Sequence, residues 1–596
     1  MYVVRNRMQI AARQLIISRN NNKTKYLSSY HQQQQLQYNN NNNIKYSSLI
    51  SPSFSRFSST ASSTTTATST SNDDINNSLA LSFDDPSSSY GMQSTGDIIR
   101  ALFVFKICSS KWLVQNCESI LNRSISLFGE SLVMFFVRPT FFAHFCAGEG
   151  EKSIQPRIDY LRSHGIGSIL DYAAEADIED SDDSQEEKDI SSSSSSSSSK
   201  DDVHSARQYT YSTEEQCDAN AKIFTDAIRA VHNVTPDGFA AIKITALCNP
   251  LLLERWSTSL VEIRNLFSRI DNDSSGLLTY DEFSAGWKKY FDLDEDKIKE
   301  KFQQFDKSGS GKISSIEWTT VLNAKDTMEL ASDCVETGPF ANAALNDEEV
   351  ELMERMEKRV EKLVALADEL DVRLMIDAEH SYFQPAIDNI VLNLQRKYNK
   401  NGKDRVYNTF QCYLKDSERR VRRHVQRASY ENWEFAAKIV RGAYMVLERE
   451  RAEQMGYESP IHNTVMDTHE NFDNVVKYII NRESVQNNKS KVNLVVASHN
   501  QNSIENTINE MKKAGVTKDE DNVYFGQLLG MADHLTFTLG SNGYTAYKYL
   551  PYGPINEVMP YLIRRAQENS DVMSGVTKER KMMWAELMKR IGLYKK

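Results

Sequence analysis

The stretch EEVELMERMEKRVEKLVALADELDVRLMID at residues 348–377 places a helical pattern directly before a buried strand. Up to Leu370 its apolar residues recur three and four positions apart, which predicts an amphipathic helix. The closing run VRLMID, residues 372–377, is short and almost continuously apolar, as in strands of a parallel sheet that are buried on both faces. A helix followed by such a strand is the repeating unit of an α/β fold.

The same alternation extends along most of the chain. Helical patterns separate seven further short runs that are rich in Val, Ile, Leu and aromatic residues. These strand candidates are GSILDYA (167–173), FAAIKITAL (239–247), NTFQCYL (408–414), FAAKIV (435–440), NLVVAS (493–498), VYFGQLL (523–529) and AYKYL (546–550). Eight strands that alternate with helices predict an α/β fold built on a closed (β/α)8 barrel.

A barrel of this kind carries its functional groups at the C-terminal ends of its strands. Polar and charged residues do lie in or directly after the predicted strands of this sequence: Lys243, Asp377, Gln411, Lys438, Arg441, Tyr444, His499 and Tyr549. Any one of them could be a solvated surface group. Their coincidence at six strand ends favours a functional site.

The last helical pattern, NEVMPYLIRRAQEN at residues 556–569, supplies a second set of candidates. Tyr561, Arg564, Arg565 and Glu568 recur at helical spacing and therefore share one face. Two adjacent guanidinium groups on such a face can clamp a carboxylate through paired hydrogen bonds. Taken alone, the two arginines are better explained as surface charges.

Composition narrows the class of protein. The chain has 596 residues and a net charge of −11, which argues against nucleic acid as a main partner because phosphate binding needs a basic face. Its seven cysteines are scattered and include no C-x-x-C pair. This pattern fits a reduced compartment and argues against a disulfide framework or a zinc ribbon.

The N-terminal region has a composition of its own. Residues 1–72 contain no Asp or Glu, and Arg5, Arg13 and Arg19 lie among aliphatic residues. An acid-free start that is rich in Arg and Ser predicts a mitochondrial transit peptide within a disordered region at 1–95. A disordered polar tail without a targeting role is the alternative.

Two further segments differ from the barrel pattern. Residues 96–163 are expected to be helical, because charges break the apolar stretch 98–146 before it reaches the ~20 residues of a membrane span. These helices either pack on the core or lie on a membrane surface. Residues 178–203 are acidic and then poly-serine, which predicts a disordered loop outside the barrel.

The sequence DNDSSGLLTYDE at residues 271–282 has the spacing of an EF-hand calcium loop. A second loop, DKSGSGKISSIE at 306–317, begins 35 residues later, as in a paired unit. The predicted Ca2+ ligands are Asp271, Asp273, Ser275, Thr279 and Glu282 in the first loop, and Asp306, Ser308, Ser310, the Lys312 carbonyl and Glu317 in the second. The second loop, with two carboxylates, is either a weaker site or a structural partner. The pair predicts a helical insert at 258–323.

Eight ordered blocks of the sequence resemble the proline dehydrogenase family. The blocks are AIKITAL (241–247), MIDAEHSYFQPAID (375–388), TFQCYL (409–414), KIVRGAY (438–444), VVASHN (495–500), GQLLGMAD (526–533), YKYLPYG (547–553) and YLIRRAQEN (561–569). The segment RPTFFAHFCAGE at 138–149 resembles the mitochondrial, eukaryotic members. With this resemblance, the barrel is expected at residues 164–257 and 324–596, and the EF-hand pair is a departure from the family pattern.

The resemblance implies oxidation of L-proline to Δ1-pyrroline-5-carboxylate, the first step of proline catabolism, by hydride transfer to N5 of an FAD cofactor. Electrons would then pass to a membrane quinone, with the enzyme at the inner mitochondrial membrane surface on its matrix side. The implied catalytic residues are Lys243, Asp377, Tyr549, Arg564 and Arg565, with Leu528, Tyr561 and Tyr444 around the substrate. Lys243 and Asp377 are expected to form a buried pair beside the substrate. The implied FAD-binding residues are Gln411, Lys438, Arg441, Thr468, His499 and Glu568.

Three alternatives stay open at this stage. A hydroxyproline dehydrogenase is disfavoured by Tyr549, because a bulky phenol against the substrate ring leaves little room for a 4-hydroxyl group. A flavin barrel that reduces folates needs a pocket for a large planar ligand, which the paired arginines suit less well. A calcium-binding scaffold on an inactive barrel would have lost catalytic groups, whereas every expected position is filled. Calcium that orders the insert and modulates activity or membrane docking is a further hypothesis.

Overall fold

The computed structural model describes residues 81–173, 213–319, 323–336, 338–481, 493–517, 522–571 and 573–593. Phe83–Arg449 and Pro460–Lys596 belong to one compact unit, which contains the barrel. The predicted transit peptide and the acidic, serine-rich loop lie outside the described residues. Residues 86–90, inside the region expected to be disordered, form a short helix, and Tyr90 is fully buried.

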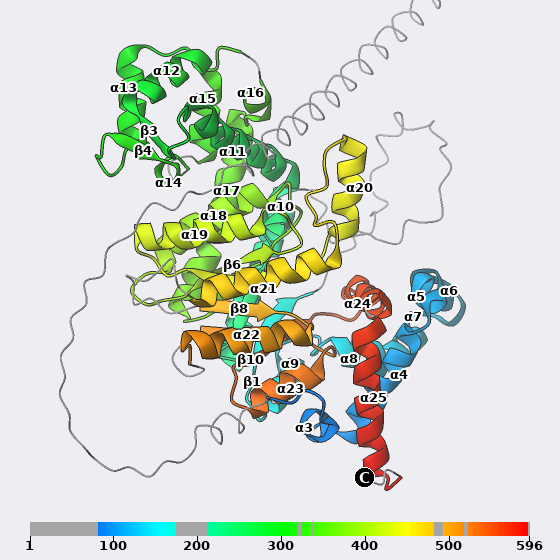
Figure 1. The fold of residues 1–596 in the computed structure, drawn as a ribbon. Helices are drawn as coiled ribbons and strands as arrows, with labels where there is room; N and C mark the ends of the chain where they lie inside the picture. The colour runs from blue at the N-terminus through cyan, green and yellow to red at the C-terminus, as the bar shows by residue number, and fades with distance from the viewer. Residues whose placement is uncertain are drawn as a thin grey trace, which may run out of the picture. The chain divides into compact units, whose positions relative to one another are not determined.

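Eight parallel strands close into a barrel (Figure 1). They are β1 (Ile166–Tyr172), β2 (Phe239–Ile242), β5 (Arg373–Ile376), β6 (Val406–Gln411), β7 (Ala436–Val440), β8 (Asn493–Ala497), β9 (Asn522–Leu528) and β10 (Ala546–Tyr552). Each strand pairs with the next in sequence, and β10 closes the ring on β1, where Ala546 lies opposite Ile166. The predicted (β/α)8 barrel is confirmed.

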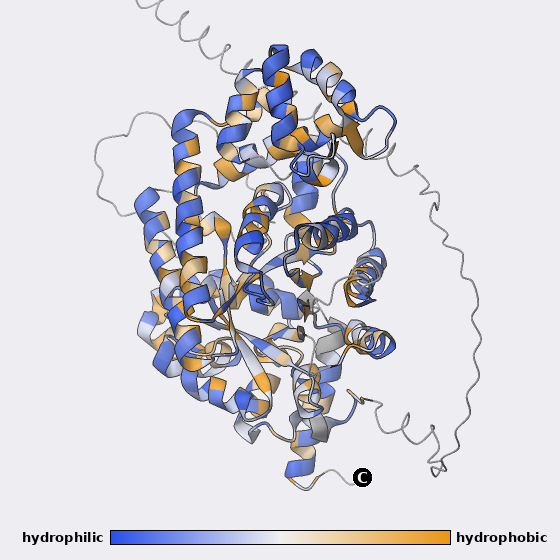
Figure 2. Ribbon diagram, turned by 90° about the vertical axis from the view of Figure 1, so that its left-hand side faces the viewer, coloured by the Kyte–Doolittle hydropathy of each residue, from blue (hydrophilic) through white to orange (hydrophobic). Residues whose placement is uncertain are grey.

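Helices connect the strands and cover the barrel. They are α10 (Glu214–Val234), α11 (Pro250–Ile270), α17 (Asp347–Glu369), α18 (Gln384–Tyr398), α19 (Ser417–Glu431), α21 (Val465–Asn481), α22 (Gln501–Ala514) and α23 (Asp533–Ser541). Helix α17 shows the local cause: Asn346 caps its first turn, and a stripe that includes Val350, Met353 and Val360 is buried. The helices in Figure 2 accordingly carry both hydrophilic and hydrophobic residues.

The interior of the barrel is filled by one layer of side chains to which every strand contributes. The layer consists of Ile169, Phe239, Met375, Tyr407, Ala436, Val495, Tyr524 and Tyr547. The guanidinium of Arg373 lies 4.3 Å from the centre of the Phe239 ring and donates to the Tyr547 hydroxyl at 3.3 Å. The barrel is therefore a packed core that supports its C-terminal mouth, and not a pore.

The strand predicted at 239–247 is too long. Pairing ends at Ile242, and Ile244–Leu247 form a short 3-10 helix, η2. The cause is a buried carboxylate, since Glu379 accepts hydrogen bonds from both the backbone N–H and the hydroxyl of Thr245. These bonds turn the chain away from the sheet immediately after Lys243.

The predicted insert grows directly out of a barrel helix. Helix α11 runs unbroken through the expected boundary at 258, so that its first half packs on the barrel and its second half on the insert. The insert continues with β3 (Leu277–Thr279), α12 (Tyr280–Tyr290), α13 (Glu295–Phe305), β4 (Lys312–Ser314) and α14 (Ser315–Trp318), followed by α15 (Ala324–Ser332) and α16 (Pro339–Ala343). Strands β3 and β4 pair antiparallel, with Leu278 opposite Ile313. An apolar core that includes Phe283, Trp287 and Trp318 holds the helices together.

The N-terminal helices pack against the C-terminal ones, so the two ends of the described chain meet (Figure 1). The first group is α3 (Pro86–Tyr90), α4 (Thr95–Cys108), α5 (Lys111–Gln115), α6 (Cys117–Phe128), α7 (Glu130–Val137), η1 (Arg138–Phe142), α8 (Ala143–Phe145) and α9 (Glu151–Arg162). The second is α24 (Met559–Asp571) and α25 (Met573–Arg590). Phe105 of α4 and Met583 of α25 belong to one buried cluster.

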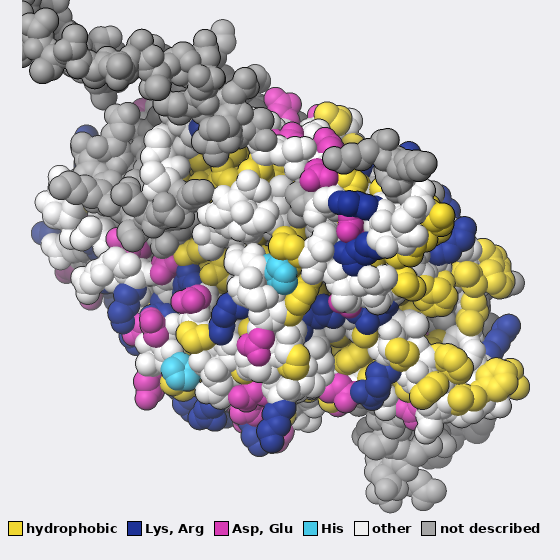
Figure 3. Space-filling model, turned by 90° about the horizontal axis from the view of Figure 1, so that it is seen from below, with side chains coloured by type: hydrophobic (Ala, Val, Ile, Leu, Met, Phe, Trp, Pro, Cys, Tyr) yellow, Lys and Arg dark blue, Asp and Glu magenta, His cyan; other side chains and the backbone are white. Residues whose placement is uncertain are grey.

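Helices α4 to α7 also expose large apolar side chains, which gather toward one side of the view in Figure 3. We call this set the apolar patch: Ile99, Phe103, Trp112, Ile120, Leu127, Phe128, Leu132, Phe135 and Phe136. The most exposed side chains of this set are those of Leu127, at 76%, and Phe135, at 69%. Among the described helices, none has the length and hydropathy to cross a bilayer.

The contact between α3 and α25 predicts that the stability of the protein depends on pH. Glu579 of α25 is buried and accepts hydrogen bonds from the Tyr90 hydroxyl (3.0 Å) and from the backbone N–H groups of Ala532 and Asp533. Burial opposes ionisation, but hydrogen bonds and the nearby His534 and Lys548 outweigh it and lower the pKa of Glu579 to about 2.

A carboxylate whose pKa falls on folding stabilises the native state at any pH above its pKa in the unfolded chain. This stability is lost as the pH falls from that pKa to the lower pKa of the folded state. For Glu579→Gln we therefore expect the free energy of unfolding at pH 7 to fall by about 2–3 kcal/mol. The difference in the free energy of unfolding between this variant and the unaltered protein should become smaller as the pH falls below about 4.5. Thermal melting measured from pH 7 to below about pH 4.5 checks the loss of stability and its dependence on pH. Glu300→Gln, at an exposed glutamate, is the control. An equal effect of Glu579→Gln at every pH would contradict the assignment.

Candidate active site at the barrel mouth

The predicted site residues at the strand ends come together because neighbouring strands end side by side. The backbone N–H of Asp377, just after β5, donates to the carbonyl of Ile242 at the end of β2 (2.9 Å). Lys243 and Asp377 therefore follow adjacent strands at the same rim of the barrel. Lys243 is buried, with 5% of its surface exposed.

Two side chains from different strands meet the carboxylate of Asp377. Lys438 of β7 forms an ion pair with one carboxylate oxygen, and the hydroxyl of Tyr549, from β10, donates to the other at 3.3 Å. The ammonium of Lys438 also lies 5.7 Å from the centre of the Tyr549 ring. The Lys438 and Asp377 side chains are only 9% and 14% exposed, so water screens this pair weakly. We call these three residues the Asp377 cluster. Sequence analysis placed Lys438 with the cofactor and did not foresee this ion pair.

A second buried carboxylate, Glu379, was missed by sequence analysis. Burial raises its pKa, opposed by the hydrogen bonds from Thr245 and by the charge of Lys243. Its backbone carbonyl accepts a hydrogen bond of 2.7 Å from the side chain of Gln411. Its position two residues after the predicted strand 372–377, in the block MIDAEHSYFQPAID, was the signal available in the sequence.

Arg441 follows β7 and is held by three hydrogen bonds. Its guanidinium donates to the hydroxyls of Ser498 (2.7 Å) and Ser503 (2.8 Å) and to Nδ1 of His469 (3.0 Å). Burial lowers the pKa of Arg441. Thr468, predicted to contact the cofactor, is buried one residue before His469 on α21. Sequence analysis did not identify His469 or the two serines as partners of this arginine.

Tyr444 lies in an aromatic and acidic group that sequence analysis also missed. Its ring is 4.4 Å from that of His380, and His380 Nδ1 lies 3.7 Å from the carboxylate of Glu448. Glu448 has no exposed surface, and the Ser381 hydroxyl donates to it at 2.6 Å. The loop after β5 is thus fixed to the start of α20 (Met445–Met455).

His499 and Leu528 are joined by a hydrogen bond at the ends of β8 and β9. The backbone N–H of Leu528 donates to Nε2 of His499 at 3.1 Å, which requires this nitrogen to be an acceptor. Solvent reaches the ring, but the enclosing protein and the neighbouring charge of Lys548 lower the pKa of His499 well below its usual range. The imidazole is therefore neutral and offers its other nitrogen as a donor.

The face predicted for residues 556–569 lies on α24. Tyr561 is buried, the Arg565 guanidinium lies 5.0 Å from the centre of its ring, and Glu568 forms an ion pair with Arg565. Leu528 packs against the cluster that contains Tyr561, and the charge of Arg565 acts on His499. Arg564, one residue before Arg565 on this helix, is partly buried. Helix α24 therefore approaches the ends of β8 and β9.

The first predicted calcium loop brings three carboxylates together. Oxygens of Asp271, Asp273 and Glu282 lie within 4.8 Å of one another. The Asp271 carboxylate already accepts from the backbone N–H groups of Ser275 and Gly276, both at 3.0 Å, so the loop is closed around it. Ser275 donates to the Leu277 carbonyl, and Thr279 to Glu282.

The second loop is folded in the same way with fewer acids. Asp306 accepts from the backbone N–H groups of Ser310 and Gly311 and from the hydroxyl of Ser308. Glu317 accepts from the backbone N–H of Ser308 (3.1 Å), and the Lys312 carbonyl accepts from the Ser310 hydroxyl (2.9 Å).

A closed parallel barrel with a carboxylate, an ammonium and a phenol at its C-terminal mouth defines the protein as a (β/α)8-barrel enzyme. A family model described as proline dehydrogenase matches residues 154–578, which include all eight barrel strands. The chain belongs to the proline dehydrogenase family.

Relatives agree with this assignment. Proline dehydrogenase 1, mitochondrial, from Homo sapiens is 35% identical over 544 residues, which cover 86% of this chain and 90% of the human one. The protein of the same name from Drosophila melanogaster is 33% identical, and the alignment covers 86% of this chain and 81% of the fly protein. Hydroxyproline dehydrogenase from Xenopus laevis is 27% identical, with 86% of this chain and 91% of its own covered.

Among solved structures, proline utilization A from Bdellovibrio bacteriovorus, inactivated by N-propargylglycine, aligns with a TM-score of 0.48 and 14% identity. The alignment covers 83% of this chain and 39% of the bacterial one. The barrel assignment rests on the strand order of the present structure.

Proposed function

We propose that the protein oxidises L-proline to Δ1-pyrroline-5-carboxylate in the proline catabolism of mitochondria. The observation that carries the proposal is the Asp377 cluster at the barrel mouth of a chain that belongs to the proline dehydrogenase family. Hydride loss from the carbon next to the ring nitrogen leaves positive charge on that nitrogen. A buried carboxylate beside the amine stabilises this charge where it develops.

Each substrate-binding role is assigned to a residue at the mouth. Arg564 and Arg565 bind the proline carboxylate, because two guanidinium groups complement its oxygens. Asp377, with Lys243 buried beside it, orients the amine. Tyr549, Tyr561, Leu528 and Tyr444 enclose the ring and exclude water. The contact of Tyr549 with Asp377 fixes its phenol at the mouth, which supports proline over its 4-hydroxy derivative.

The mouth also fits an FAD cofactor. A pyrophosphate needs buried donors and positive charge, and Arg441 supplies both at the end of β7 with its side chain held by serines. Gln411, Lys438, Thr468, neutral His499 and Glu568 would complete the FAD site around it. FAD, when bound, supplies a hydride acceptor at N5. The protein's own contribution is to place the substrate carbon and exclude water from the mouth.

Bleaching of the flavin band near ~450 nm on addition of substrate tests the function. We expect L-proline to bleach the purified protein under anaerobic conditions, and 4-hydroxyproline to bleach it far less. Arg565→Met should weaken proline binding about 100-fold, because it removes charge-assisted hydrogen bonds, while the protein stays yellow. Arg229→Met, an exposed arginine on α10, is the control. A yellow protein that is indifferent to proline would contradict the substrate, and stronger bleaching by hydroxyproline would favour that alternative.

We further propose that the first loop of the insert binds Ca2+. Three carboxylates within 4.8 Å of one another, in a loop whose backbone already turns around Asp271, support this proposal. Such a hard cation would neutralise their mutual repulsion and stabilise the insert.

Calcium binding has a direct test. We expect one or two Ca2+ ions per chain at roughly 1 mM calcium, and one fewer in Glu282→Gln, because the loop then lacks its bidentate ligand. Asp306→Asn in the second loop should leave the first ion bound. Equilibrium dialysis of the full chain measures the count, and melting with calcium or chelator measures the stabilisation. An unaltered protein that binds no calcium would refute the proposal.

We also propose that the apolar patch docks the enzyme on the inner mitochondrial membrane, where a membrane quinone takes the electrons. The exposed Phe135 and Phe136 belong to the same helical region as the exposed Trp112, and exposed apolar side chains of this size mark interaction surfaces. Helices that lie on a membrane bury such a face among the lipid headgroups.

Vesicle binding tests this docking. Replacement of both Phe135 and Phe136 by Ser removes about 2 kcal/mol of burial each, so binding to cardiolipin-containing vesicles should weaken by at least about 100-fold. Proline-dependent reduction of a quinone held in those vesicles should fall with it, whereas flavin bleaching in solution should not. The exposed Tyr430→Ser on α19 serves as the control. Equal vesicle binding by the double variant and by Tyr430→Ser would show that the apolar patch does not dock the protein on membranes.

A further inference from the structure

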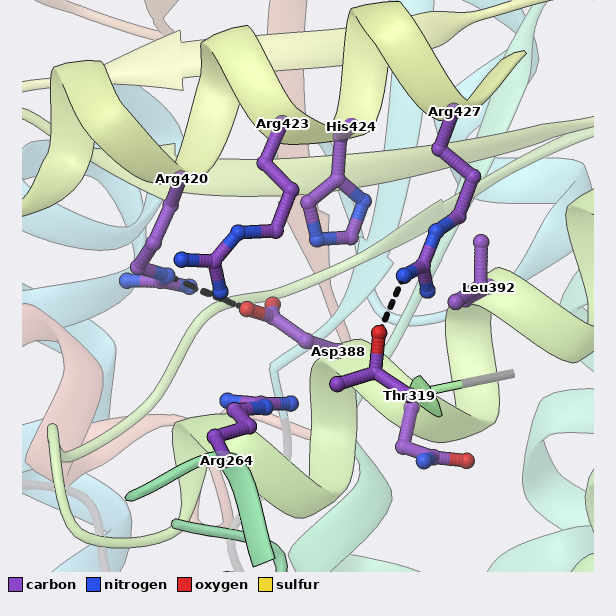
Figure 4. Close-up of a pocket in the computed structure, with 9 residues that line it drawn as sticks. Arg264, Thr319, Asp388, Leu392, Arg420, Arg423, His424 and Arg427 are labelled. Atoms are coloured by element: carbon purple, nitrogen blue, oxygen red, sulfur yellow. Dashed lines mark hydrogen bonds and ion pairs between the residues drawn. The ribbon is translucent and has the colours of Figure 1, made fainter. Parts of the chain in front are cut away.

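A polar cavity lies where the predicted insert meets the outer helices of the barrel (Figure 4). Helices α11, α18 and α19 and the end of α14 form its walls. The lining residues are Arg264, Thr319, Asp388, Asn389, Leu392, Arg420, Arg423, His424 and Arg427. Its open volume is about 30 Å³, which has room for a small ion and not for an extended ligand.

The charges in this cavity do not balance. Four arginines line it together with a single carboxylate, that of Asp388. Just outside the lining, Arg420 faces Asp416 and Arg427 faces Glu431, each pair 3.9 Å apart. Asp388 is already engaged, since it accepts two hydrogen bonds from Arg420 (2.6 and 3.1 Å) and others from Gln384 and Asn408. Arg427 donates to the Ile316 carbonyl at 3.1 Å and to the hydroxyl of Thr319.

Two of the four arginines have no such partner. Within the part of the chain that the structure describes, the side chains of Arg264 and Arg423 make no hydrogen bond or ion pair, although both are partly buried. Figure 4 shows both side chains directed toward the cavity beside Asp388, Arg264 from the insert side and Arg423 from α19. A guanidinium group carries five donors, and leaving them unpaired in a partly buried place is costly.

The arginines also destabilise one another's charges. Burial, and then the charge of neighbouring arginines, lowers the pKa of Arg423 to about 10 and that of Arg427 to about 9. Burial lowers the pKa of His424 to about 3, so its ring is neutral and adds no charge. An anion in the cavity would relieve this repulsion and give the free donors a partner.

We propose that this cavity is a binding site for a phosphate group, held by Arg264, Arg423 and Arg420. A doubly charged tetrahedral oxyanion matches the two arginines without an ion pair, Arg264 and Arg423, better than a carboxylate with a single charge. Planar guanidinium groups bind phosphate oxygens through paired hydrogen bonds. The group is either free inorganic phosphate or the terminal phosphate of a nucleotide that reaches in from outside. The site is separate from the mouth, where the residues assigned to FAD lie at strand ends.

The bound phosphate joins the insert to the barrel. Arg264 lies on the part of α11 that enters the insert, and Arg423 lies on the barrel helix α19. Without the anion the two side chains repel, and with it they share one ligand. Phosphate should therefore stabilise the docking of the insert.

Phosphate binding by the full-length holoenzyme tests this proposal. In phosphate-free buffer, we expect inorganic phosphate to bind at one site per chain and to raise the melting temperature beyond the effect of sodium chloride at equal ionic strength. Arg423→Gln should weaken binding at least tenfold. It should not lower the melting temperature without phosphate, because it removes a cation that lacks a partner. An arginine with a merely structural role would lower it.

The matched control is Arg422→Gln, since Arg422 is exposed on the same helix and pairs with Glu418 outside the cavity. It should bind phosphate like the unaltered protein. Displacement of labelled phosphate by ATP at lower concentration than by inorganic phosphate would assign the group to a nucleotide, and the reverse would assign it to the free ion. Either result supports the site. No binding beyond the salt control, or equal binding by Arg423→Gln, would overturn it.

Discussion

The ion pair between Asp377 and Lys438 is the interaction on which the site depends. Asp377 follows β5, Lys438 lies two strands away on β7, and Tyr549 reaches the same carboxylate from β10, three strands farther round the ring. Three points of the circumference meet at one carboxylate only if the barrel is closed. The aromatic and aliphatic layer beneath, to which each strand gives one side chain, keeps the mouth at a fixed width. Because the pair is largely buried, loss of one partner leaves an uncompensated charge, which costs about 3–5 kcal/mol.

The sequence was sufficient for the barrel and for most positions at its mouth. Buried parallel strands are nearly continuous apolar runs, so their ends, and the groups that follow them, could be located from composition. The end of strand β2, which begins at Phe239, could not be located in this way. The strand ends at Ile242 because Glu379, far away in sequence, accepts hydrogen bonds from Thr245. The pairing of Lys438 with Asp377 could not be predicted either, because strand order places β5 and β7 on either side of β6 but does not decide which lysine the carboxylate contacts.

The unit that carries the two predicted calcium loops is fixed to the barrel through a shared helix. Helix α11 serves both, and the indole N–H of Trp318 donates to the Ile263 carbonyl at 2.8 Å where the insert returns to that helix. Arg427 reaches across from α19 to Thr319. The cationic cavity lies at this contact, and Asp388 at its wall also accepts from Gln384, whose carbonyl oxygen accepts from the Glu379 backbone.

A double-mutant cycle on Asp377 and Lys438 tests the central claim most directly. The quantity to measure is kcat/KM for proline in Asp377→Asn, Lys438→Met and the variant with both changes. The account predicts that each single change lowers kcat/KM at least about 100-fold and that the double change is no worse than the more damaging single one, a coupling of at least about 2 kcal/mol. Effects that simply multiply, with no coupling between the two positions, would contradict the claim that this ion pair organises the active site.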